Sequence, residues 1–80
     1  MKYPCPCCGQ RTYVSAKRDS YEVCPVCFWE DDLVQFEDPS FSGGANEVSL
    51  QEARENYRAF KASGARFVKA VRPPAPEEIP

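Results

Sequence analysis

Five cysteines, all within the first 27 residues, carry most of the chemistry available to this 80-residue chain. Four of them form two C-x-x-C pairs, Cys5 with Cys8 and Cys24 with Cys27, and residues 9–23 separate the pairs. That spacing is typical of a structural zinc site. Four thiolates at about 2.3 Å close a tetrahedron around zinc and leave no open position for a substrate. We therefore expect these four cysteines to hold one structural Zn²⁺, although four thiolates also suit a single iron.

Each pair also has the residues of a tight turn. Pro6 and Pro25 follow the first cysteine of their pairs and fix the backbone φ angle there. Gly9, directly after Cys8, permits the positive φ that such a turn often needs. We call the two expected turns the first and second knuckles.

Cys7 is the surplus cysteine, because Cys5 and Cys8 reproduce the separation of Cys24 and Cys27. It has three interpretations: a spectator, an alternate ligand that exchanges with a neighbour, or a reactive thiol with a lowered pKa. We favour the spectator, since the chain contains no histidine to act as a base.

Length and composition limit the protein to one small domain. The hydrophobic core of a chain this short contributes only ~3–5 kcal/mol to the free energy of folding, so an additional cross-link such as a structural metal is expected. Structural zinc, at an apparent ~10–16 kcal/mol, is large enough to decide whether the fold exists. An odd number of cysteines, no apparent secretory segment and no apolar run of ~20 residues favour a reducing, cytoplasmic location without a membrane. The absence of histidine excludes Ser-His and Cys-His nucleophile pairs and His-ligated catalytic zinc.

The residues between the knuckles favour β-structure. Residues 10–16 include Thr12, Tyr13 and Val14, and residues 21–23 alternate apolar and polar side chains. We expect these two segments to pair as the hairpin of a zinc-ribbon-like fold. Phe28 and Trp29 should pack against the second knuckle and the later helix, with Trp29 as most of the core, although the pair could instead form an aromatic contact surface.

An amphipathic helix is predicted at about 49–63. Ser49 and Glu52 form a capping box, Gly64 suits the position beyond the end, and an apolar face should pack on the hairpin. The fold class is therefore small α+β, with one zinc-ribbon-like domain at 1–72 and an extended, proline-rich tail at 73–80. We expect the carboxylates at 30–32 to form a solvated acidic face or to pair with the basic helix, and glycines 43–44 to be flexible loop backbone.

Charge is distributed unevenly along a chain whose net charge is −2. Residues 1–48 hold four basic and eight acidic side chains, a balance of −4, whereas residues 49–72 hold six basic and two acidic, a balance of +4. We favour mutual attraction of the two halves over an external partner as the reason. The basic side chains are nevertheless candidate contacts for a partner or for nucleic-acid phosphates: Arg54, Arg58, Lys61, Arg66, Lys69 and Arg72.

Several segments together resemble the cysteine-rich CPCC family of small bacterial proteins. They are Tyr3-Pro-Cys-Pro-Cys-Cys-Gly9, Cys24-Pro-Val-Cys-Phe-Trp-Glu-Asp-Asp32, Gly43-Gly-Ala-Asn46, Val48-Ser-Leu50, Glu52-Ala-Arg-Glu-Asn56 and Val71-Arg-Pro-Pro74. The likeness spans nearly the whole chain. It implies a zinc-ribbon-type domain with an added helix, and it carries no catalytic role.

Three functions remain open on the sequence. The leading hypothesis is a zinc-stabilised, non-enzymatic module that binds an unidentified protein. The second is a nucleic-acid-binding zinc ribbon that uses the basic 54–72 segment, which the acidic net charge disfavours. The third is a thiol redox protein, which normally needs a larger α/β fold around its C-x-x-C pair.

Overall fold

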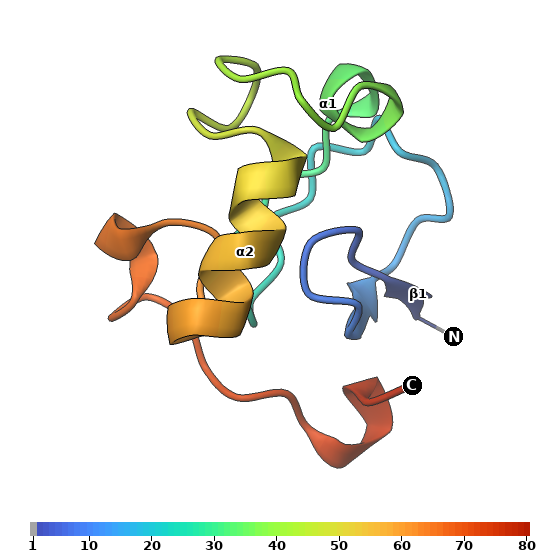
Figure 1. Ribbon diagram of the computed structural model, residues 1–80. Coiled ribbons are helices and arrows are strands. Elements are labelled where there is room, and N and C mark those ends of the chain that lie inside the picture. The colour runs from blue at the N-terminus through green and yellow to red at the C-terminus, as the bar shows by residue number, and fades with distance from the viewer. Residues whose placement is uncertain (1) are drawn as a thin grey trace.

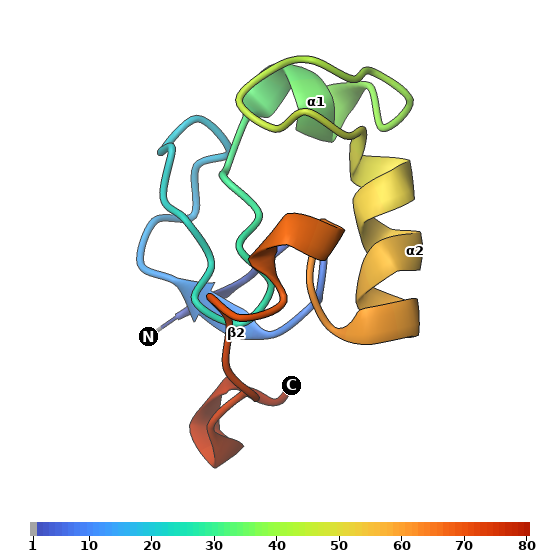
Figure 2. The same cartoon turned by 90° about the vertical axis from the view of Figure 1, so that its left-hand side faces the viewer.

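The computed structural model describes residues 2–80. In chain order its elements are β1 (Tyr3–Pro4), β2 (Arg11–Tyr13), α1 (Leu33–Glu37), α2 (Leu50–Phe60) and the 3₁₀ turns η1 (Ala65–Phe67) and η2 (Pro76–Glu78). In the view of Figure 2, α2 runs along one side of the molecule and the loops of the first half lie opposite it. This small α+β architecture, with one antiparallel strand pair and one main helix, is the predicted fold class. Within residues 2–80 the structure has no helix with the length and apolar character to cross a membrane.

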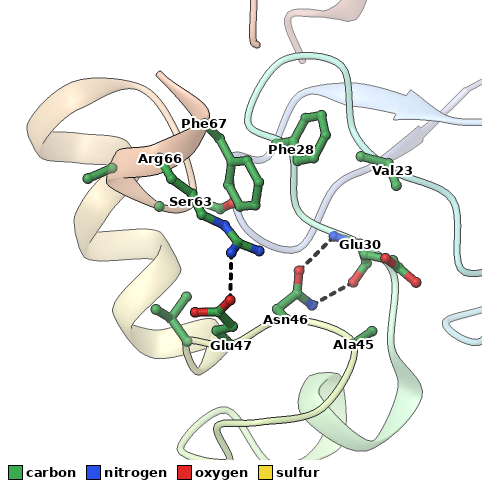
Figure 3. Close-up of a pocket in the computed structure, with 12 residues that line it drawn as sticks. Val23, Phe28, Glu30, Ala45, Asn46, Glu47, Ser63, Arg66 and Phe67 are labelled. Carbon is green, nitrogen blue, oxygen red and sulfur yellow. Dashed lines mark hydrogen bonds and ion pairs between the residues drawn. The ribbon is translucent and has the colours of Figure 1, made fainter. Parts of the chain in front are cut away.

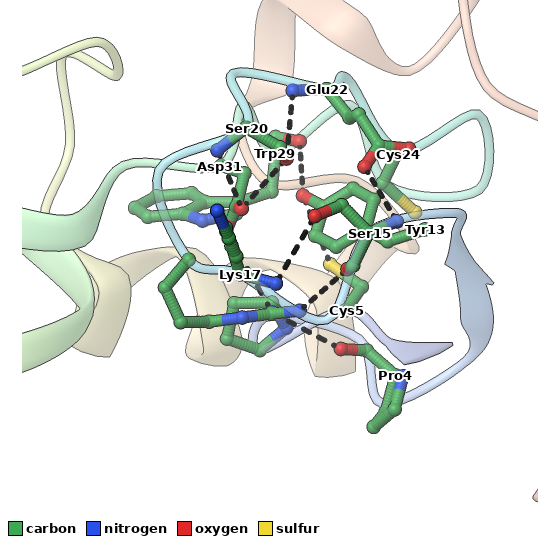
Figure 4. A network of polar contacts seen from close by, with 12 residues as sticks. Pro4, Cys5, Tyr13, Ser15, Lys17, Ser20, Glu22, Cys24, Trp29 and Asp31 are labelled. Atoms are coloured by element: carbon green, nitrogen blue, oxygen red, sulfur yellow. Dashed lines mark hydrogen bonds and ion pairs between the residues drawn. The ribbon is translucent and has the colours of Figure 1, made fainter. Parts of the chain in front are cut away.

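The expected pairing of residues 10–16 with 21–23 is wrong. Strand β2 pairs with β1 across the first knuckle, with Tyr13 opposite Tyr3. Val23 forms an antiparallel bridge with Glu30 across the second knuckle. In each knuckle, therefore, the residues just before the turn pair with the residues just after it. The Glu22 carboxylate explains the difference, since it accepts the N–H groups of residues 14 and 15 at 2.8 and 3.0 Å. Those amides are therefore occupied by a side chain instead of a second strand (Figure 4).

Helix α2 begins as predicted and ends early. The Ser49 hydroxyl accepts the Glu52 N–H at 3.1 Å, which confirms the N-cap. The helix ends at Phe60 because Lys61 is left-handed, with φ at 65°, so the prediction of Gly64 as the terminator is wrong. The early end lets the chain turn back to the second knuckle, where the Ser63 N–H donates to the Cys27 carbonyl at 2.7 Å.

The core lies between α2 and the knuckles (Figure 1). Leu50 and Ala53 of the helix are fully buried against the cysteines, Tyr13 and Trp29. Trp29 is 0% exposed, which confirms its predicted place in the core. A cluster this small buries little apolar surface, so the knuckle cysteines form a large share of it.

Two of the carboxylates expected to be solvated are buried instead. Asp32 caps α1: one oxygen accepts the Gln35 N–H at 3.1 Å and the other accepts the Ala45 N–H at 2.8 Å. Asp31 accepts the Ser20 hydroxyl at 2.9 Å and lies 3.7 Å from Arg18. Neither carboxylate pairs with the basic helix, and that expectation is wrong for both.

The loop from 39 to 48 is held against α1 by buried polar groups. The Gln35 side-chain amide lies within 3.0–3.2 Å of three of the loop's carbonyl oxygens. A Cβ at Gly44 would approach Asp32 to 2.8 Å and Gln35 to 2.9 Å. Gly44 is therefore a position of close packing, and the prediction that it is merely flexible backbone is wrong.

The C-terminal residues differ from the extended tail that the prolines predict. Arg72 makes two parallel bonds to Glu78 at 2.8 and 2.9 Å, and Glu78 also accepts the Ala75 N–H at 2.8 Å. Turn η2 packs against β2. Arg72, followed by the Ala75 N–H, lowers the pKa of Glu78 to about 2.

Replacing Glu78 by Gln should release η2 at neutral pH, because the charge-assisted fork to Arg72 is lost. The measurement is the amide-exchange protection factor of Ala75, with exposed Glu77→Gln as the matched control. A carboxylate with a lowered pKa stabilises the docked turn above its unfolded value of 4.5 and loses this effect only as the pH falls towards about 2. The difference between wild type and Glu78→Gln should hence stay constant from pH 7 to pH 5. A difference that shrinks within that range contradicts the assignment.

Candidate metal centre

The two knuckles, residues 5–10 and 24–29, share one backbone hydrogen-bond pattern. In each, the N–H of the first cysteine donates to the carbonyl five residues later, and the carbonyl of that cysteine accepts the N–H four residues later. The distances are 2.8 and 2.8 Å in the first knuckle and 2.9 and 2.7 Å in the second. Each turn thus presents its two sulfurs in the same way.

The sulfurs of Cys5, Cys8, Cys24 and Cys27 meet at one point, all within 4.8 Å of one another. The Sγ atoms of Cys5 and Cys27 are 3.6 Å apart, and those of Cys8 and Cys24 are 3.7 Å apart. A tetrahedron with ligands at ~2.3 Å has edges of about 3.8 Å, so the four atoms fit a tetrahedral thiolate site. The four cysteines are positioned to hold a metal ion, and the Cys7 sulfur is not part of the group.

Neighbouring polar groups orient these sulfurs. The Thr12 hydroxyl donates to the Cys24 sulfur at 3.0 Å, and the Cys7 N–H donates to the Cys5 sulfur at 3.4 Å. The Tyr13 hydroxyl donates to the Trp29 carbonyl at 2.8 Å, which fixes its ring beside Cys5 (Figure 4). Partners of this kind hold ligands in position and tune their affinity for a metal.

The electrostatics of the cluster favour a cation at its centre. Hydrogen bonds from Cys27, and then from Cys5 and Cys8, lower the pKa of Cys24. The hydrogen bonds to Cys24 in turn raise the pKa of Cys8 and of Cys27, because each of these thiols would lose its bond and add a second buried negative charge on losing its proton. A divalent ion offsets that negative charge and deprotonates its thiol ligands outright. Loading is therefore coupled to proton release and weakens as the pH falls.

The six basic residues singled out in the sequence do not form one patch. Arg66 pairs with Glu47 at 2.6 Å, and Arg72 pairs with Glu78. Arg54 donates from Nε to the Pro6 carbonyl at 2.8 Å, which ties α2 to the first knuckle. Among the described residues, Arg58, Lys61 and Lys69 are exposed and make no ion pair.

Phe28 has a backbone conformation that the sequence analysis did not predict. It occupies the position of Gly9 in the second knuckle and has φ at 71°, against 81° for the glycine. Its ring stacks on Phe67, with centroids 4.4 Å apart, so it attaches η1 to the knuckle. Comparing the two knuckles position by position would have revealed it.

These two rings form one wall of a hollow of about 330 Å³ (Figure 3). On the other side, the Asn46 amide bonds to both backbone groups of Glu30, at 2.9 and 2.8 Å. The Arg66–Glu47 pair also lines it. Most polar groups of this hollow are thus paired with one another.

Fold and site together define a small α+β protein in which two knuckles gather four cysteines, an arrangement consistent with a zinc ribbon. The chain belongs to the cysteine-rich CPCC family, whose model matches residues 3–78. That match includes η2, which agrees with the docking of this turn on β2. A comparison with curated proteins finds no match.

Replacing Cys24 by Ser should abolish stable metal binding and the folded NMR dispersion, because a buried ligand from the shared centre is lost. Cys7→Ser is the matched control and should retain one metal equivalent and the fold. Metal analysis and NMR of both variants, expressed without added zinc, make the comparison. Equal metal content in the two variants would contradict the four-cysteine assignment.

Phe28→Gly should be more stable than Phe28→Ala by about 1 kcal/mol, since only glycine adopts positive φ without strain. Both variants lose the stacked ring, so the difference between their free energies of unfolding reports the cost of the positive φ alone. Thermal unfolding of the metal-loaded proteins measures it. An alanine variant as stable as the glycine variant would show that this turn is unstrained.

Proposed function

We propose that this protein is a zinc-stabilised binding module that acts through protein–protein contact and has no catalytic role. The observation that carries the proposal is the cluster of four sulfurs, three of them from fully buried cysteines and one from the half-buried Cys8. A tetrahedron completed by four protein ligands offers no coordination position to water or substrate. Its contribution is to hold a small fold that presents a surface.

Zinc is the ion we assign to this centre. Four thiolates in a tetrahedron suit zinc, and the sulfur separations match its bond lengths. Zinc has no redox chemistry of its own, which agrees with a structural role. Iron is the alternative that metal analysis distinguishes.

Nucleic-acid binding through the basic 54–72 segment is the second candidate. The exposed Arg58 and Lys61 favour it, because neither is used in an ion pair within residues 2–80. Against it, Arg66 and Arg72 are already neutralised by carboxylates. Few phosphates can then be contacted at once, so the expected affinity is low. Thiol redox chemistry is less supported still, since both C-x-x-C pairs belong to the cluster.

We infer a reducing compartment, the cytoplasm, as the place of action. All five cysteines are free thiols, and a four-thiolate site needs them reduced.

Affinity capture from the native lysate tests the protein–protein role. The zinc-loaded chain should repeatedly recover the same protein, and the purified pair should bind with a defined stoichiometry in calorimetry. Cys24→Ser is the control for fold-dependent capture. Recovery of no partner in repeated experiments overturns the proposal.

A titration with labelled RNA and DNA at low salt tests the second candidate. Binding that weakens steeply with added salt would support nucleic acid as the partner.

A further inference from the structure

We propose that the C-terminal half of α2 carries a docking surface for an acidic, apolar segment of a partner protein. The surface joins two hollows, which we call the basic hollow and the apolar groove. The basic hollow lies beside the first knuckle and the apolar groove beside the second. Tyr57 and Lys61 line both, so the two are adjacent. The inference rests on the proposed binding function and names its surface and the chemistry of its partner.

The basic hollow has a volume of about 430 Å³. Its charged lining consists of Arg54, Arg58 and Lys61, with no carboxylate among the lining residues. Arg54 and Arg58 are one turn apart on α2 and share a face of the helix, and Lys61, the residue that ends the helix, lines the same hollow. Arg58 and Lys61 are exposed and have no carboxylate within ion-pair distance in the described part of the chain.

The metal centre beneath the hollow cancels only part of this charge and leaves a formal +1. One divalent ion with four thiolates carries a formal −2, whereas the three cations carry +3. Arg54 is the cation tied to the knuckle, through the Pro6 carbonyl. Arg58 and Lys61 thus remain available to an anionic ligand in solution.

The apolar groove has a volume of about 350 Å³ and is lined mainly by Val26, Phe60, Val68, Val71, Pro73 and Pro74. Val68 is 46% exposed, a large fraction for an apolar side chain in so small a fold. The docking of η2 holds Pro73 and Pro74 in place, because Arg72 and Glu78 bracket them. The side of the groove that Pro73 and Pro74 form is therefore held in place by bonds within the fold.

The charge of the basic hollow and the apolar lining of the groove together indicate which kind of ligand binds here. A segment with one or two apolar side chains in the groove and carboxylates beside them would meet Lys61 and Arg58 directly. A nucleic-acid strand fits less well, because apolar valines and prolines offer its phosphates no partner. The hollow beside Phe28 and Phe67 is less suited to this ligand, since its lining includes the carboxylates of Glu30 and Glu47.

The test uses the full zinc-loaded chain labelled with ¹⁵N and a synthetic twelve-residue peptide of Asp, Glu, Leu and Phe. Two control peptides replace the acids by Gln or the apolar residues by Ser, and a twelve-nucleotide thymidine strand represents nucleic acid. Saturable amide shifts should be confined to residues lining the two hollows, and both control peptides should bind more weakly. The double variant Arg58→Glu/Lys61→Glu should weaken binding about ten-fold, since two exposed ion pairs become repulsive. Arg11→Glu/Lys17→Glu has the same charge change away from this surface and should bind as wild type does.

Three results overturn the inference: peptide shifts that lie elsewhere or do not saturate, tighter binding of the thymidine strand at these residues, or self-association that occupies the surface. Metal content should equal one equivalent in all variants, which separates lost binding from lost folding. A captured protein that still binds Arg58→Glu/Lys61→Glu overturns this surface and leaves the protein–protein function standing. If no protein is captured while the peptide still shifts these amides, the protein–protein function is overturned and the peptide-binding surface stands.

Discussion

Two turns distant in the chain must deliver their sulfurs to one point, and the rest of this structure follows from that requirement. Two sulfur contacts, Cys5 with Cys27 at 3.6 Å and Cys8 with Cys24 at 3.7 Å, run between the knuckles. Apart from these residues the core contains few large side chains, with Trp29 and Tyr13 at its centre. A hydrophobic cluster of this size supplies only a few kcal/mol, and a metal bound by the four cysteines would add the stabilisation needed to offset the entropy of ordering the chain. The helix then has a fixed surface on which to pack its buried face.

Features that depend on local sequence were predictable. Cysteine spacing gave the four-sulfur cluster, and the pattern from Ser49 to Glu52 gave the start of α2 to the residue. The pairing of strands was not predictable, because it depends on the Glu22 side chain occupying two backbone amides. The end of α2 likewise depends on a tertiary bond, from Ser63 to the second knuckle, which outweighs the cost of a left-handed lysine.

The burial of polar side chains is a second feature that the sequence pattern does not predict. Asp31, Asp32 and Gln35 lie in a stretch whose composition suggests a solvated face, yet each is buried. Their partners are loop amides and carbonyls at 39–48 and the hydroxyl of Ser20. Such bonds stabilise only when nearly all are made together, and no single-residue propensity encodes them. The basic side chains show the same limit: the sequence grouped six, and the fold neutralises two of them with carboxylates.

The equal division of the four sulfurs between two knuckles has a kinetic consequence. An ion cannot leave by the opening of one turn alone, since each turn holds only two of its four ligands. Metal exchange must therefore proceed by stepwise ligand release, and the first step falls to the most accessible sulfur. That sulfur is Cys8, which is half-buried while Cys5, Cys24 and Cys27 are at most 1% exposed. Release of the Cys8 sulfur, at the edge of the centre next to the basic hollow, should accordingly set the rate of metal exchange.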